Sequence, residues 1–420
     1  MGETALLALL RASLTEGDLE LLRSPGSPPS DAGYDGAMRA VLQKLPALER
    51  QVARGMTRVE TRYQDVTELP RGRLLTLLTN SDPPLLAALC RVLMRRSFQA
   101  RFADVEASLR CAEIAQQAAR SLRDRDYFAP DLQADLEAEA WSYLANARRI
   151  NSDLPGAETA FRKAESHLEL GTGDRTLRAT FCFLKAFLSF RQGRCSEATA
   201  LLDQEIGLRR LLGDRDRLAH ALINRGVVTA WSGPLDEACD YLLAGVRRTD
   251  DDDYLALALP PLAERLARDG RPQMAWKTLR AAETVTRLTG ARGHDLRLRW
   301  IRGLAHRASG ELESAAGELC EVREELVRRG QRFKAALAAL DLAAVRVAQG
   351  RHGEVKSLAR EAYEIFRSEA AEKRMLTAFL VLYRAVEAGE LTEAVAVRVA
   401  NFVARAQHDR SLRFSEAPGS

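Results

Sequence analysis

A glycine recurs about every 40 residues through the second half of the chain, and this spacing restricts the fold more than any other feature. The glycines are Gly193, Gly233, Gly270, Gly310, Gly350 and Gly389, with intervals of 40, 37, 40, 40 and 39 residues. Small or apolar residues keep the same phase five residues after and seven residues before each glycine. Those after it are Ala198, Ala238, Ala275, Ala315, Val355 and Ala394, and those before it are Ala186, Gly226, Ala263, Gly303, Ala343 and Leu382. A fixed period of this length is typical of solenoids, whose units bury their apolar faces by stacking.

Each repeat is predicted to be a helix–turn–helix unit. The small residues before and after the turn would face each other across two helices, where larger side chains push the helix axes apart. The glycine between them would supply the positive φ with which helices commonly end. Between units, Gly171–Asp174 and Gly213-Asp214 have the pattern of a helix-ending glycine followed by an N-capping aspartate.

The composition favours an all-α fold. Apolar residues make up 46% of the 420 residues and aromatic residues only 6%, and leucine and alanine dominate. These residue types, with arginine and glutamate, lose little conformational freedom in a helix. The apolar fraction is also large enough to bury a core.

One unit before the glycine series resembles the tetratricopeptide repeat. Its matching residues are Trp141, Leu144, Ala145, Ala157, Phe161 and Ala164. Later repeats keep the small positions, as in Ala263 with Ala275 and Ala282, and Ala343 with Ala362. The departure is the period, which is about 40 residues against the usual 34, so each helix is expected to be about one turn longer. The resemblance covers residues 133–408 and implies a right-handed α-solenoid of antiparallel helix pairs, as in the sensor regions of some bacterial regulators.

The predicted organisation has four parts. Residues 1–36 comprise a short helical segment and a Pro/Gly/Ser linker, and residues 37–122 form N-terminal capping helices. Residues 123–410 form the solenoid, with about six repeats and a degenerate C-terminal pair. Residues 411–420 are expected to be a disordered tail.

Charge and cysteine content indicate no special environment. The net charge is only +4, and the six cysteines form no C-x-x-C pair. The first residues lack the positive charge of a signal peptide, and no apolar run reaches the roughly 20 residues that span a bilayer. We therefore expect a cytoplasmic protein without a membrane partner.

No motif for catalysis, metal binding or cofactor binding stands out, so the sequence predicts a protein that is not an enzyme. The six histidines never occur three or four residues apart, and no phosphate-binding glycine loop or nucleophile elbow is present. The acidic run 250–253 falls at the start of a predicted helix, where acids cap the helix and oppose its dipole. We interpret it as a cap rather than as a cation site.

The resemblance implies that the first helix of each repeat lines a concave groove. Carried onto this chain, the predicted peptide- or protein-binding residues are Asn146, Arg149, Phe183, Phe187, Phe190, His220, Trp231, Glu264, Arg268, Trp300 and Arg307. Val227 adds to the third repeat, and Leu340, Ala344 and Val347 would form an apolar end. Aromatic residues and arginine are enriched at binding surfaces. The alternative, that the three phenylalanines pack the inside of the superhelix without meeting a ligand, stays open, as does a similar choice for the two tryptophans.

Two functions from different classes fit these features. The first is a scaffold that holds a protein or peptide in the groove, and the second is a regulatory sensor that binds a signal and controls an effector or transcription factor. A nucleic-acid partner ranks lower, because glutamate and aromatic residues are mixed with the arginines of the groove, and the basic segment 91–101 is interpreted as a solvated helix face. A homo-oligomer is compatible with the sequence.

Overall fold

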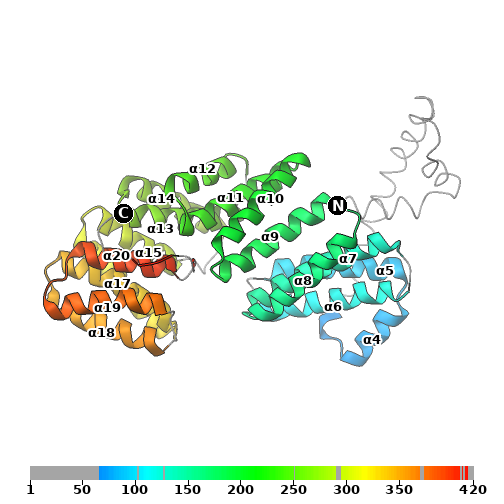
Figure 1. Cartoon of the computed structure of the whole chain (residues 1–420), viewed down its shortest axis with the longest axis horizontal. Helices are drawn as coiled ribbons and strands as arrows, with labels where there is room; N and C mark the ends of the chain where they lie inside the picture. The colour runs from blue at the N-terminus through cyan, green and yellow to red at the C-terminus, as the bar shows by residue number, and fades with distance from the viewer. Residues whose placement is uncertain are drawn as a thin grey trace. The chain divides into compact units, whose positions relative to one another are not determined.

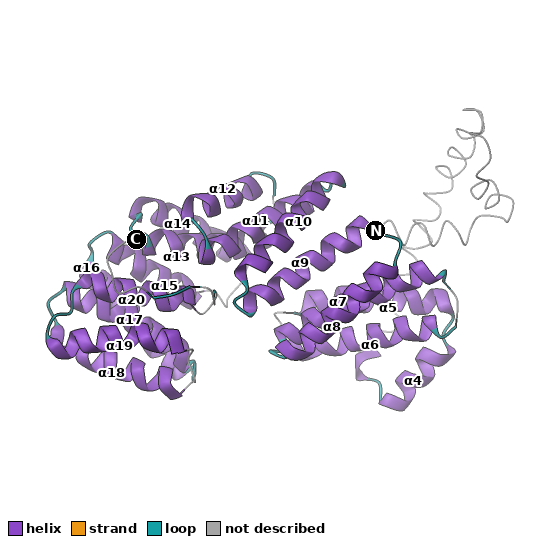
Figure 2. Ribbon diagram, in the orientation of Figure 1, coloured by secondary structure: helices purple, strands orange, loops and turns teal. Residues whose placement is uncertain are grey.

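The computed structural model describes residues 66–414, except for 102–103, 126–127, 250, 290–294, 369–372, 407–408 and 410–411. The predictions for residues 1–65 therefore lie outside the described residues. Throughout the described ranges the regular structure is helical, with no strand (Figure 2). The chain divides into two compact units, with the boundary between Leu188 and Ser189.

The first unit is built from antiparallel helices (Figure 1). Helices α5 and α6 pack along each other, as do α7 and α8, and α6 also packs on α7. The elements are η1 (Val66–Glu68), α4 (Arg71–Asn80), α5 (Pro83–Ala100), α6 (Val105–Arg123), α7 (Pro130–Ile150), α8 (Leu154–Leu170) and most of α9 (Arg175–Arg191). The six residues of the tetratricopeptide signature lie on α7 and α8, and five of them are buried, from Leu144 to Ala164.

The second unit continues with the same helix-pair architecture. Its elements are α10 (Cys195–Leu211), α11 (Arg215–Ser232), α12 (Leu235–Val246), α13 (Asp252–Arg268), α14 (Pro272–Thr289), α15 (Asp295–Ala308), α16 (Leu312–Arg328), α17 (Arg332–Ala348), α18 (His352–Ser368), α19 (Lys373–Ala388) and α20 (Glu393–Ala406). The first helices of successive repeats, α11, α13, α15 and α17, contact one another in series. We call them the inner row. Most helices have 14 to 18 residues, as the long period predicts.

The small positions bring paired helices close together, as predicted. A Cβ atom on Gly226 of α11 would lie 2.5 Å from Leu242 Cγ and 3.1 Å from the carbonyl oxygen of Ala238, both on α12. A Cβ atom on Gly303 of α15 would lie 2.9 Å from Leu319 Cγ on α16. At Gly226 the backbone of α12 leaves little room for a side chain, whereas at Gly303 only side-chain atoms of α16 would have to move.

The turn glycines confirm the predicted backbone conformation at five of six positions. Gly193, Gly270, Gly310, Gly350 and Gly389 have φ between 71° and 79°. Gly233 is the exception, with φ −116° and ψ −168°. Proline follows it, and Pro234 forces the preceding residue toward extended geometry, so the prediction of positive φ was wrong there.

Aspartates cap helices where the sequence predicted them. Asp174 Oδ1 accepts a hydrogen bond from the backbone N–H of Thr176 at 2.7 Å, and Asp214 Oδ1 accepts one from Arg217 at 3.1 Å. In the acidic run, Asp251 Oδ1 accepts a hydrogen bond from the backbone N–H of Tyr254 at 3.3 Å. The side chain of Asp251 therefore caps α13.

Candidate binding surfaces

Four aromatic rings from three helices meet in the first unit. Phe98 of α5 lies edge-to-face with Tyr143 of α7 at 6.2 Å and with Phe183 of α9 at 6.1 Å, and Phe183 lies edge-to-face with Phe187 at 5.5 Å. We call these four residues the aromatic cluster. Edge-to-face contact brings the positive edge of one ring to the negative face of the next. The cluster therefore joins α5, α7 and α9 at positions distant in the sequence.

Two arginines border the aromatic cluster. The Arg149 guanidinium lies 5.7 Å from the Phe187 ring centre, and that of Arg101 lies 3.8 Å from the Phe98 ring centre. Asn146 Oδ1 accepts hydrogen bonds from Arg149 Nε at 3.2 Å and Nη2 at 2.8 Å. The predicted residues Asn146, Arg149, Phe183 and Phe187 are thus brought together. The oxygen of the buried Asn146 side chain is engaged by Arg149, which leaves its amide nitrogen as the group that would bond a peptide backbone.

The aromatic cluster is neither fully exposed nor fully buried. All four of its rings are half-buried, whereas Phe161 on the neighbouring α8 is 1% exposed and packs edge-to-face on Phe181. Core phenylalanines of this unit therefore differ from those of the cluster. The rings contact each other and also present surface to solvent. Their geometry is therefore compatible both with packing inside the superhelix and with contact to a ligand.

In the second unit, the predicted binding residue Arg268 is buried in an ion pair. Arg268 Nη1 and Nη2 each lie 2.9 Å from one carboxylate oxygen of Asp341 on α17, and both side chains are buried. Arg268 Nε donates to Glu264 Oε1 at 3.2 Å. Burial alone would lower the pKa of Arg268, but the carboxylates of Asp341 and Glu264 outweigh it and raise the pKa. The guanidinium therefore joins α13 to α17, and a ligand contact by Arg268 stays a prediction.

Trp300 extends the same network. Its indole N–H donates to Asp341 Oδ2 at 2.9 Å, and the half-buried ring packs against apolar residues of the unit. Glu264 also pairs with Arg297 at 3.6 Å. The predicted residues Arg268 and Trp300 thus both bond the carboxylate of Asp341, and the predicted residue Glu264 bonds Arg268.

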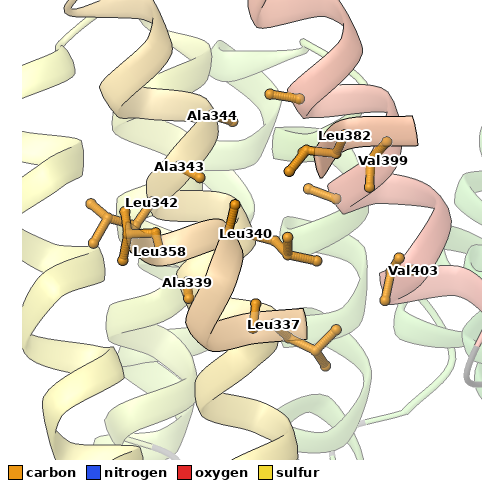
Figure 3. Close-up of a cluster of buried hydrophobic side chains, with 14 of the residues drawn as sticks. Leu337, Ala339, Leu340, Leu342, Ala343, Ala344, Leu358, Leu382, Val399 and Val403 are labelled. Carbon is orange, nitrogen blue, oxygen red and sulfur yellow. The ribbon is translucent and has the colours of Figure 1, made fainter. Parts of the chain in front are cut away.

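Helix α20 covers part of the inner row. The three residues predicted to form an apolar end of the groove, Leu340, Ala344 and Val347, are buried, and α17 packs extensively on α20. Figure 3 shows Leu337 and Leu340 of α17 on the side that faces Val399 and Val403 of α20. The prediction of an open apolar surface there was wrong. The physical reason is that α17 and α20 each have an apolar face, and the two faces bury each other by packing together.

Polar contacts continue α20 across the inner row. Asn401 Nδ2 donates to the carbonyl oxygen of Arg268 at 3.2 Å, and Arg268 Nη1 donates to Asn401 Oδ1 at 3.3 Å. Arg405 Nε donates to the carbonyl oxygen of Trp231 on α11 at 3.1 Å. The predicted residue Trp231 is 9% exposed. Helix α20 therefore occupies part of the surface where repeats three, four and six were expected to meet a ligand.

His220 lies apart from this network. Its ring stacks on Tyr254 with centroids 3.4 Å apart, and Nε2 is 3.4 Å from Asp251 Oδ2. Burial lowers the pKa of His220, although Asp251 opposes the shift. Phe190 is half-buried on the last turn of α9.

Several residues of these surfaces were missed from the sequence. Asp341 is the single acid in the apolar run 335–345, and a lone acid in such a run signals a buried partner. Phe98 and Tyr143 carried a weaker signal, since Tyr143 lies three residues before Asn146 on the same helix face. Asn401 carried none.

The helix pairs, close-packed small residues and turn glycines define an all-α, tetratricopeptide-like repeat protein. A Rap protein complexed with Competence and Sporulation Factor has a similar structure, with TM-score 0.56 and 13% identity over 76% of this chain and 88% of that one. This similarity confirms the repeat fold. The apo quorum sensor NprR from B. thuringiensis matches with TM-score 0.49 and 14% identity over 81% of this chain and 99% of its own. No protein-family model and no curated protein sequence matches the chain.

Two further observations concern the described part of the chain. None of its helices is both long enough and apolar enough to cross a membrane. It contains no group of three or more histidine, cysteine, aspartate or glutamate side chains placed to hold a metal ion.

Proposed function

We propose that this chain binds a protein or peptide through the aromatic cluster and Arg149 of its first unit, as a regulatory repeat protein. The observation that carries this proposal is the partial exposure of four clustered rings beside two arginines. Rings already held by one another lose little conformational freedom on binding, and arginine can pair with a carboxylate of the partner. The Rap structure contains a bound factor, which agrees with a binding role for this fold.

The first unit is favoured over the second because of what already covers each surface. On the second unit, α20 lies across the inner row and engages Arg268 and the carbonyl of Trp231. A partner there would have to displace a helix with several buried apolar residues. In the described part of the chain, by contrast, all four rings of the aromatic cluster keep exposed surface.

A sensor, rather than a passive scaffold, is supported by the way α20 is held. Hydrogen bonds from Asn401 and Arg405 join α20 to α13 and α11 beside its apolar contact with α17. A helix that bridges three repeats couples their arrangement, so a bound signal could change the surface that an effector meets.

Site-specific crosslinking tests the proposed surface. A photoreactive phenylalanine analogue placed at position 187 should capture a partner from extracts of the native host, which mass spectrometry then identifies. The same analogue at Leu211, which is 70% exposed on α10, provides the control. Capture at both positions, or at neither, would contradict the proposal.

A further inference from the structure

A cavity of about 780 Å³ lies between α13, α15 and α20 in the second unit. Its volume falls within the range of about 300–1,000 Å³ that is usual for small-ligand sites. Apolar walls come from residues such as Val397 and Phe402, and Leu412 and Arg413 also line the cavity. Phe414 lies edge-to-face on Phe402 with ring centres 5.1 Å apart. The cavity is therefore apolar in part and bounded by side chains from three elements.

The charged lining of this cavity is mainly basic. Five arginines line it, against two acids, Asp269 and Glu393. Asp269 already pairs with Arg265 at 3.0 Å, and Glu393 lies exposed in the first turn of α20. Arg268 is neutralised by Asp341. The remaining arginines leave a net positive charge at the cavity wall.

Arg307 lines the cavity without a carboxylate partner among the described residues. Its Nε is buried and has no hydrogen-bond acceptor in the described part of the chain, and no carboxylate there lies within ion-pair distance of it. Burial lowers the pKa of Arg307, and the more distant Asp341 and Glu393 only partly oppose this shift. A half-buried guanidinium without an acceptor is costly, because buried charges are normally paired.

A second lining arginine shows the same deficiency. Arg398 of α20 also has a buried Nε without an acceptor among the described residues, and its guanidinium lies 5.7 Å from the Phe414 ring centre. Two lining arginines without a carboxylate partner among the described residues suit a ligand that brings one. A planar carboxylate is the group that matches the guanidinium fork.

We infer that this cavity is a binding site for a carboxylate carried on a small apolar body, namely the C-terminal or side-chain carboxylate of a peptide, with Arg307 as the residue that pairs with it. The apolar wall formed by Val397 and Phe402 would take the body, and Arg307 the charge. That the ligand is a peptide rests on the proposed function, whereas the carboxylate is inferred from the cavity itself.

Three small probes test the inference on the full chain by calorimetry and ligand-observed NMR. N-acetyl-L-leucine represents a peptide C-terminus, N-acetyl-L-glutamic acid α-amide represents an acidic side chain, and N-acetyl-L-leucinamide is the uncharged control. At least one acid should bind at millimolar concentration, about tenfold or more tightly than the leucinamide. The acid that binds more tightly identifies the source of the carboxylate.

Two variants assign the binding to Arg307. Arg307→Gln should abolish acid binding and leave the melting temperature equal or higher, because it removes a half-buried charge that has no carboxylate partner among the described residues. The matched control Arg271→Gln removes the same charge outside the cavity, where Arg271 pairs with Asp236, and should bind the acids as the wild type does. If Arg307→Gln proves unstable, Val397→Phe keeps the guanidinium, places a larger side chain on the apolar wall of the cavity and should weaken acid binding.

Four results would overturn the inference. Either both acids fail to bind the wild type at tens of millimolar, or the leucinamide binds as tightly as the acids. The other two are unchanged acid binding by Arg307→Gln or by Val397→Phe, and tighter binding of inorganic phosphate than of either acid. None of them bears on the aromatic cluster, so the proposed function can fail or stand separately.

Discussion

Arg268 and Asp341 form a two-pronged ion pair, with 2.9 Å between each nitrogen and its oxygen, although 73 residues separate them in the sequence. Both side chains are buried, so the pair holds α13 against α17 where water cannot replace either partner. Asn401 of α20 and the indole of Trp300 bond the same pair. This network fixes three inner helices and the C-terminal helix of the second unit in one arrangement.

Loss of the carboxylate should be strongly destabilising. Asp341→Ala leaves the Arg268 charge buried with only Glu264 beside it, and we expect a loss of about 3–5 kcal/mol in the free energy of unfolding. Arg268→Met combined with Asp341→Leu removes both charges and should recover most of that loss. Urea unfolding measures both. A loss below about 1 kcal/mol for the single variant would contradict the structural role of the pair.

Two glycine substitutions test the close approach of paired helices. Gly226→Ala should cost about 1–3 kcal/mol, because the new methyl group would meet Leu242 and the backbone of α12. Gly207→Ala on α10 meets nothing within 4 Å and should stabilise the chain by about 0.5–1 kcal/mol through helix propensity. Thermal unfolding of the two variants compares them directly. Similar effects of the two changes would refute the requirement for glycine at position 226.

Burial of Glu205 predicts a pH-dependent stability. Burial raises the pKa of Glu205 from 4.5 to about 8, and Arg209 at 3.7 Å opposes the shift only partly. The folded chain therefore binds a proton that the unfolded chain has lost between these pH values, so stability falls as pH rises through this window. As pH rises from 5 to 8.5, the free energy of unfolding of Glu205→Gln should increase relative to that of the wild type by about 1–3 kcal/mol. A difference in unfolding free energy that stays constant with pH would disprove this assignment.

The cover provided by α20 can be removed locally. Val403→Asp places a charge in the buried contact with α17, and the helix should detach because an unpaired carboxylate cannot remain there. Hydrogen exchange should then increase in α20 and on the inner face of α17 while α5–α8 stay protected. Thr392→Asp is the control, since Thr392 Oγ1 accepts from Val395 N–H at the start of α20 and aspartate caps equally well. Unchanged protection of α17 in Val403→Asp would show that α20 does not cover it.

Local features of the repeat could be predicted from the sequence because they depend on neighbours within one unit. The contact of Gly226 with α12 and the cap formed by Asp214 both follow from spacing of fewer than 20 residues. Gly233 failed because the effect of Pro234 on the preceding residue was not weighed against the repeat pattern.

Contacts between repeats could not be predicted in the same way. Asn401 meets Arg268 across 133 residues, and no periodicity links the two positions. The residues Asn146, Arg149, Phe183 and Phe187 were selected because the family resemblance places one helix face inward, and they do meet. Their ring partners Phe98 and Tyr143 come from helices whose pairing follows only from the fold.

The aromatic cluster is the surface that we propose to bind a partner. We expect Phe183→Ala with Phe187→Ala to weaken partner affinity by about 30-fold or more, since clustered aromatic anchors contribute about 2 kcal/mol or more to binding. Because these rings are half-buried, the melting temperature should fall far less than for Phe161→Ala, whose core ring is worth about 3–5 kcal/mol.

The most direct test measures affinity for the crosslinked partner and the melting temperature on the same purified variants. We expect Phe183→Ala/Phe187→Ala to lose affinity while remaining folded, and Asp341→Leu/Arg268→Met to retain it. Wild-type affinity in the folded phenylalanine double variant would show that the partner does not bind through the aromatic cluster.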